Sequence, residues 1–163
     1  MKSSQQITLL QEFYLDRLAL LMRHVEGAKL ISDYENNNTY QYIIAREDMH
    51  VAWVRDAITD LGGEVPTKGT ALAVPQGGRG PSAEAAVIDD DIRHMHAFHE
   101  RWKTRIEGVT NARHRTMLRV ILGEVLEHKR FFEQAKADRE DVLGRRMPGA
   151  STGGGVLPTR WME

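Results

Sequence analysis

The stretch GEVPTKGTALAVPQGGRGP, residues 63–81, lies between two pairs of long segments that have helical periodicity. It contains three Pro and five Gly, and it has no regular apolar pattern, so it predicts an irregular connection. At roughly 3.3 Å per residue, a connection of this length can run the whole length of a helix. The segments before and after it are therefore predicted to point in the same direction.

Four segments carry apolar residues at steps of three and four, which is the spacing of an amphipathic helix. They cover residues 7–34, 39–61, 82–107 and 112–141. Short turns at ENNN (35–38) and GVTN (108–111) would make each pair antiparallel. The sequence thus predicts an all-α, ferritin-like four-helix bundle over residues 1–143, with one long crossover and an irregular Gly-rich tail at 144–163.

The composition is that of a globular domain, with 41% apolar and 28% charged residues. The formal net charge of -1 lacks the basic surplus expected of a nucleic-acid partner. The absence of Cys excludes disulfides and thiolate metal sites. The most apolar stretch, LALLMRHV, is interrupted by Arg23 and His24, so no membrane span is predicted. With no signal-like run near the N-terminus, we expect a cytoplasmic protein.

The predicted helix at 39–61 places two polar residues on its apolar face. Glu47 occupies a position that the pattern reserves for an apolar side chain, and His50 lies one turn further on the same face. Because a buried carboxylate without a partner is very unfavourable, Glu47 needs a cation, a proton or hydrogen-bond donors. The i, i+3 spacing puts both groups within reach of one metal ion.

The other three segments offer comparable groups. His128 lies on the apolar face of segment 112–141, with Glu124 one turn earlier. Segment 82–107 places Asp91 on its face, with His99 as a further candidate. If the first turn lies at ENNN, the candidate in segment 7–34 is Glu26, at about the same height as Glu47. The sequence therefore predicts a metal site at one level of the bundle, formed by Glu26, Glu47, His50, Asp91, Glu124 and His128.

These features resemble the rubrerythrin and bacterioferritin group of the ferritin-like superfamily, over roughly residues 5–140. The resemblance rests on Glu47-Asp48-Met49-His50, on the LGG that follows this helix, and on the spacing to Asp91 and Glu124. It implies a centre of two Fe ions, with Mn or Zn as alternatives, held by carboxylates and imidazoles. The chain departs from the family in having Asp91 rather than Glu, and Glu124 four rather than three residues before His128. Family spacing also favours Glu12 over Glu26.

The resemblance implies oxidoreductase or ferroxidase chemistry with O2 or peroxide, and an external electron donor, since the chain lacks Cys. Two alternatives remain open. One is a metal-free bundle for assembly, in which the tail segment VLPTRWME docks on another subunit of a homo-oligomer. The other resembles the DinB-like group, with one Zn or Ni ion bound by His50, His128 and a third histidine.

Overall fold

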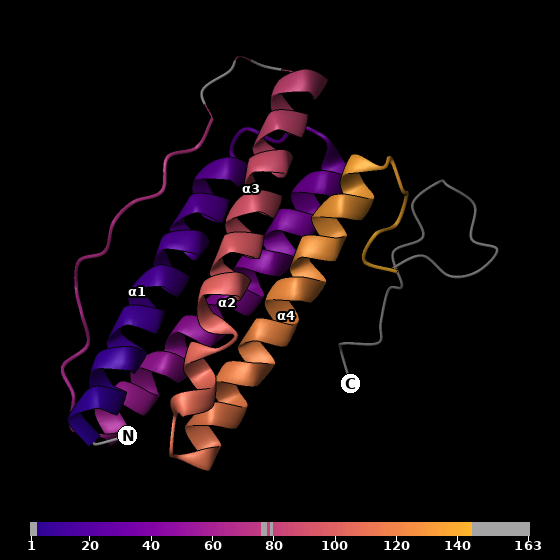
Figure 1. Cartoon of the computed structure of the whole chain (residues 1–163). Coiled ribbons are helices and arrows are strands. Elements are labelled where there is room, and N and C mark those ends of the chain that lie inside the picture. Colours follow the sequence, from indigo (N-terminus) through magenta and orange to yellow (C-terminus); the bar gives the residue numbers. More distant parts are fainter. Residues whose placement is uncertain (1–2, 76–77, 79, 145–163) are drawn as a thin grey trace, which may run out of the picture.

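The computed structural model describes residues 3–75, 78 and 80–144, and the predicted tail lies almost entirely outside this range. Within it the chain forms α1 (Ser3–Ala28), α2 (Tyr34–Asp60), α3 (Pro81–Trp102), the short 3-10 helix η1 (Arg105–Gly108) and α4 (Ala112–Lys136), without a strand. Figure 1 shows the four long helices packed side by side as a bundle. The predicted all-α four-helix fold is confirmed. None of the helices in the described part of the chain combines the length and apolar character needed to cross a membrane.

The connection between α2 and α3 runs along the outside of α1 from one end of the bundle to the other (Figure 1). Two side chains of α1 hold it there: Gln11 donates to the carbonyl of Glu64 at 2.7 Å, and Arg23 donates to the carbonyl of Ala73. Because the connection spans the length of the bundle, α2 and α3 point in the same direction, as in a four-helix bundle with one long crossover.

The turn between α1 and α2 lies earlier than the ENNN prediction. Asp33 caps α2 by accepting a hydrogen bond from the backbone N–H of Asn36 at 2.9 Å, so ENNN belongs to the first turns of this helix. Asn37 instead satisfies the end of α1, because its side-chain amide donates to the carbonyls of Ala28 and Ile31. Asn and Asp are both favoured at helix N-caps, so residue type alone did not show which residue would cap α2.

The ends of the other helices follow local backbone chemistry. Gly62 adopts a φ of 75° directly after α2, and the N–H of Gly63 donates to the carbonyl of Ile58 at 2.9 Å, as in a Schellman motif. α3 begins at Pro81. Proline has no backbone N–H, and this costs nothing here because an N–H in the first turn of a helix has no hydrogen-bond partner within the helix. Asn111 caps α4 through the N–H of His114.

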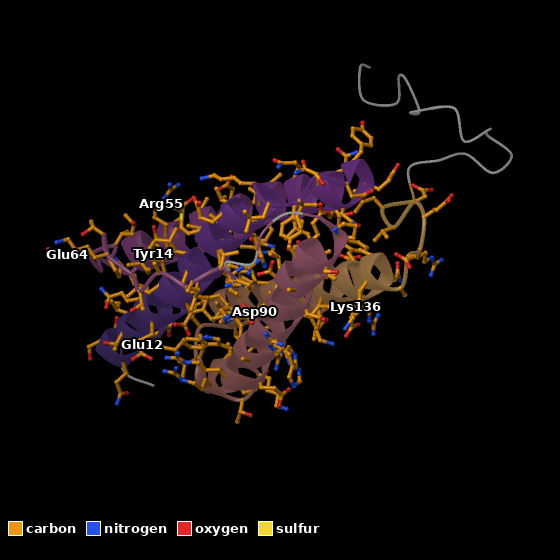
Figure 2. The ribbon with its side chains drawn as sticks, turned by 90° about the horizontal axis from the view of Figure 1, so that it is seen from above. Glu12, Tyr14, Arg55, Glu64, Asp90 and Lys136 are labelled. Atoms are coloured by element: carbon orange, nitrogen blue, oxygen red, sulfur yellow. The ribbon has the colours of Figure 1, made fainter. Side chains whose placement is uncertain are left out.

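The apolar core runs the length of the bundle. Near the end where α3 meets η1, the ring of Phe13 packs edge-on against Trp102 and Phe98, at centroid distances of 4.9 and 5.2 Å. Figure 2 shows side chains from all four helices filling the space between the ribbons, with Glu12 near one end of the bundle and Lys136 near the other. A set of charged side chains interrupts this core at mid-length.

Candidate functional site

Charged and polar side chains from all four helices meet in the interior of the bundle. We call this set the polar core; its members are Arg17, Arg23 and His24 from α1, Tyr40, Glu47 and His50 from α2, Asp91 from α3, and Glu124 and His128 from α4. All except Glu124 are buried. Each buried charge needs a partner, since desolvation of an isolated ion is very unfavourable.

Glu47 lies between two cationic groups of α1. Nδ1 of His24 donates to its Oε2 at 2.8 Å, and Nη1 of Arg17 lies 2.9 Å from its Oε1, as an ion pair outside hydrogen-bond geometry. Burial disfavours the carboxylate, but the positive charges of Arg17 and His24 outweigh it and lower the pKa of Glu47 to about 2. Burial also disfavours imidazolium, yet Glu47 raises the pKa of His24. Glu47 is therefore a buried carboxylate anion with charged partners.

Asp91 is held in the same way on the neighbouring side. Nε of Arg23 donates to Oδ1 of Asp91 at 2.6 Å, and the hydroxyl of Tyr40 donates to Oδ2 at 2.5 Å. Burial, together with the charge of Asp91, raises the pKa of Tyr40, so the phenol stays protonated and remains a donor. Nε2 of His24 is 3.7 Å from Asp91, which links the partners of Glu47 to those of Asp91.

His50 connects Arg17, the partner of Glu47, to Glu124 of α4. Its Nδ1 accepts from Nη2 of Arg17 at 3.0 Å, so its Nε2 carries the proton and donates to Glu124 at 2.9 Å. Burial and the charge of Arg17 lower the pKa of His50 to about 4, so the ring is neutral near pH 7. Glu124 also accepts two hydrogen bonds from Arg46, which lies toward the surface.

His128 differs from the other members because both its ring nitrogens are buried without a hydrogen-bond partner among the described residues. It stacks on the ring of His50 at a centroid distance of 6.2 Å and contacts the rings of Tyr42 and Phe131. Burial lowers its pKa to about 3, although the charge of Glu47 opposes this shift. A neutral imidazole has one donor and one acceptor, and leaving both unmade is costly. His24 Nε2 and Glu47 Oε1 also lack hydrogen bonds.

The structure brings five of the six predicted site residues together: Glu47, His50, Asp91, Glu124 and His128. Glu26 is not among them, because its side chain is 52% exposed and pairs with Lys29 on the surface. The alternative, Glu12, pairs with Arg105 and is 43% exposed. His99 lies against Glu100, away from the polar core.

Three residues of α1 take the place expected for a helix acid, and the sequence interpretation did not include them. Arg23 and His24 were treated only as polar interruptions of an apolar stretch, and Arg17 was not considered, although all three are buried. The signal was present in the spacing: Leu10, Phe13, Arg17, Leu20 and His24 form a stripe with steps of three and four, and all five are buried.

Arg17 and Arg23 limit the number of metal ions that the polar core can bind. In the described part of the chain, no three His, Asp or Glu side chains are placed to surround a metal ion. Arg17 and Arg23 lie within 2.9 Å and 2.6 Å of Glu47 and Asp91, where a second metal ion would need free carboxylate oxygens. The residues do not fit two metal ions, because the guanidinium groups already provide the positive charge that such ions would supply.

Comparison of the chain with models of protein families, with curated proteins and with solved structures found no match.

Proposed function

We propose that the polar core binds one divalent first-row transition-metal ion, and that His128, Glu47 and His24 become its ligands by turning toward a common point, since no three such side chains of the described residues already surround one. The observation that carries this proposal is His128, a fully buried imidazole whose two nitrogens have no partner among the described residues. Among the described residues, Glu47 Oε1 and His24 Nε2 are the other buried atoms that lack hydrogen bonds and can ligate a metal ion, and the charge of Glu47 acts on the pKa of His128. Oxygen and imidazole ligands without sulfur suit Fe, Mn or Zn.

Charge balance supports one ion rather than two. Arg17, Arg23 and Arg46 form ion pairs with four carboxylates, those of Glu47, Asp90, Asp91 and Glu124, and protonated His24 supplies the remaining positive charge. Metal binding at His24 releases its proton. One divalent cation then leaves a single surplus positive charge, whereas two would leave three in a buried site. Binding requires Glu47 to turn partly away from Arg17.

The chemistry follows from the ion. Fe or Mn would supply redox reactivity toward O2 or peroxide, and Zn would supply Lewis acidity. The chain's own groups have separate tasks: Arg17 holds Glu47 ionised, and Arg23 and Tyr40 fix the position of Asp91. Redox turnover would need an external electron donor, since the chain has no Cys.

Metal titration of the metal-free full chain tests the proposal, with Fe(II), Mn(II) and Zn(II) added separately and followed by calorimetry and elemental analysis. We expect one tightly bound ion per chain for at least one metal. His128→Leu should abolish binding without breaking a hydrogen bond, while Glu26→Ala, on the surface, should bind normally. If none of the three metals binds, the proposal is wrong. If two ions bind per chain, the site is instead a two-metal centre, as the family resemblance implies.

The ion pairs favour a second candidate, a metal-free bundle whose function is to bind a partner or ligand. Arg17, Arg23 and Arg46 already give each carboxylate of the polar core a cationic partner without any metal. In that case the polar core serves to define one arrangement of the four helices, a role known for some buried ionic groups. The same titration separates the candidates, because this one predicts no stoichiometric metal.

A further inference from the structure

A groove on the outer surface lies between α1, α3 and the crossover, and it shares no residue with the polar core. Its volume of ≈ 740 Å³ falls within the range of small-molecule sites, about 300–1,000 Å³. A second hollow of ≈ 530 Å³ shares Glu12 and Leu15 with it and continues along α1 beneath residues 64–67. The two together form an elongated space.

The groove has an apolar floor. Six aliphatic or aromatic side chains form it: Leu15, Ala19, Leu20, Leu72, Ala97 and Phe98. Leu20 and Phe98 are buried in the bundle, so this part of the floor is fixed by core packing. An apolar floor of this kind matches an alkyl chain, because burial of each methylene group adds to binding.

One cationic side chain that lines the groove has no acidic partner among the described residues. Arg105 pairs with Glu12 at 2.5 Å, and Arg101 pairs with Asp16 at 3.1 Å, so both acids of the lining are neutralised. Lys68, which is exposed on the crossover, lines the groove and forms no ion pair with any residue that the structure describes. The ≈ 740 Å³ groove thus combines an apolar floor with a net positive rim, while the second hollow adds one acid, Glu64, to the elongated space.

We propose that this groove binds an amphipathic monoanion, an alkyl carboxylate whose chain lies on the apolar floor and whose head group pairs with Lys68 and the exposed side of Arg101. The apolar floor provides most of the affinity, and the rim selects the sign of the head group. Because the groove and the polar core have separate residues, the proposal holds with or without a metal ion in the bundle.

Calorimetric titration of the full chain with decanoate tests the proposal, with decan-1-ol and decyltrimethylammonium as probes of equal chain length. We expect saturable binding of one decanoate, weaker binding of the alcohol, and binding of the cation weaker by about tenfold or more. Lys68→Glu should weaken decanoate binding by about tenfold, and it should not affect folding because Lys68 is exposed.

A groove-filling variant locates the site. Ala97→Trp should weaken decanoate binding by at least about tenfold, because the new side chain occupies the floor. Ala86→Trp, at an exposed position of α3 outside the groove, is the matched control and should bind normally. Circular dichroism confirms the fold of both variants. The proposal is overturned if the wild-type chain does not bind decanoate, if the alcohol or cation binds as tightly, or if Ala97→Trp has no effect.

Discussion

At the scale of single residues, Arg17 is the cation on which two parts of the polar core depend. Its guanidinium pairs with Glu47, donates to His50 and lies 5.7 Å from the ring centroid of Phe98. Burial lowers the pKa of Arg17, and the charge of Glu47 opposes the shift. Removal of one member of a buried pair leaves an uncompensated charge, which is far worse than loss of the whole pair.

Arg17→Met should lower the free energy of unfolding by about 3–5 kcal/mol, because Glu47 would keep only one cationic partner. The double variant Arg17→Met, Glu47→Leu should be less destabilised than the sum of the single variants by at least about 1 kcal/mol. Urea unfolding measures both. The control is Arg119→Met, which breaks a surface pair with Glu107 and should cost less than about 1 kcal/mol. Strict additivity in the cycle would show that Arg17 and Glu47 are not coupled.

At the scale of the elements, helix ends and close approaches decide where the helices lie. Gly63 follows α2 closely, and a Cβ there would lie 2.7 Å from Ile7 and 3.0 Å from Ile58. Gly123 lies at an exposed position inside α4, where a Cβ would meet nothing within 4 Å. The two glycines therefore have different roles: Gly63 allows α1 to pass close by, while Gly123 only weakens its helix.

Gly123→Ala should stabilise the protein by about 0.5–1 kcal/mol, since alanine loses less backbone entropy in a helix. Gly63→Ala should instead destabilise it, because the new methyl group overlaps the side chain of Ile7. Thermal unfolding of both variants, measured side by side, should show melting temperatures that move in opposite directions. A shift in the same direction for both would contradict the packing at Gly63.

At the scale of the whole molecule, the buried histidines make stability depend on pH. The folded-state pKa values of His50 and His128, about 4 and about 3, lie below the ordinary value of 6.5. The unfolded chain therefore binds more protons below pH 6.5, and stability falls with decreasing pH. Glu47, with its pKa lowered from 4.5 to about 2, adds to this loss below pH 4.5. His24 acts in the opposite direction, because its pKa is raised and its contribution is largest at low pH.

The metal-free protein should lose stability steadily from about pH 7 to pH 4, and His128→Leu should reduce this loss by on the order of 3 kcal/mol. The leucine cannot be protonated, so folding no longer excludes a proton at this position. Urea unfolding at about pH 7, 5.5 and 4 measures the slope. The surface variant His96→Leu serves as control and should keep the wild-type slope. An unchanged slope in His128→Leu would mean that His128 is not buried as a neutral ring.

Sequence periodicity predicted the four helices and the long crossover because both follow from local properties. Steps of three and four mark a buried helix face, and the Pro and Gly residues of 63–81 exclude a helix there. The same periodicity predicted that the side chains of Glu47, His50, Asp91 and His128 face the interior. It did not locate the first turn, since Asp33 and Asn38 are both good caps, and only the packing of α1 against α2 decides between them.

The sequence by itself determined the helical class, the order of the helices and the presence of buried carboxylates and imidazoles on three of them. Only the tertiary structure decided what surrounds these groups. Arginine is usually found at the surface, so the spacing that places Arg17 on the stripe of α1 does not by itself predict that its guanidinium is buried. Arg17 and Arg23 enter the core because carboxylates of α2 and α3, distant in sequence, lie opposite them and compensate their charge.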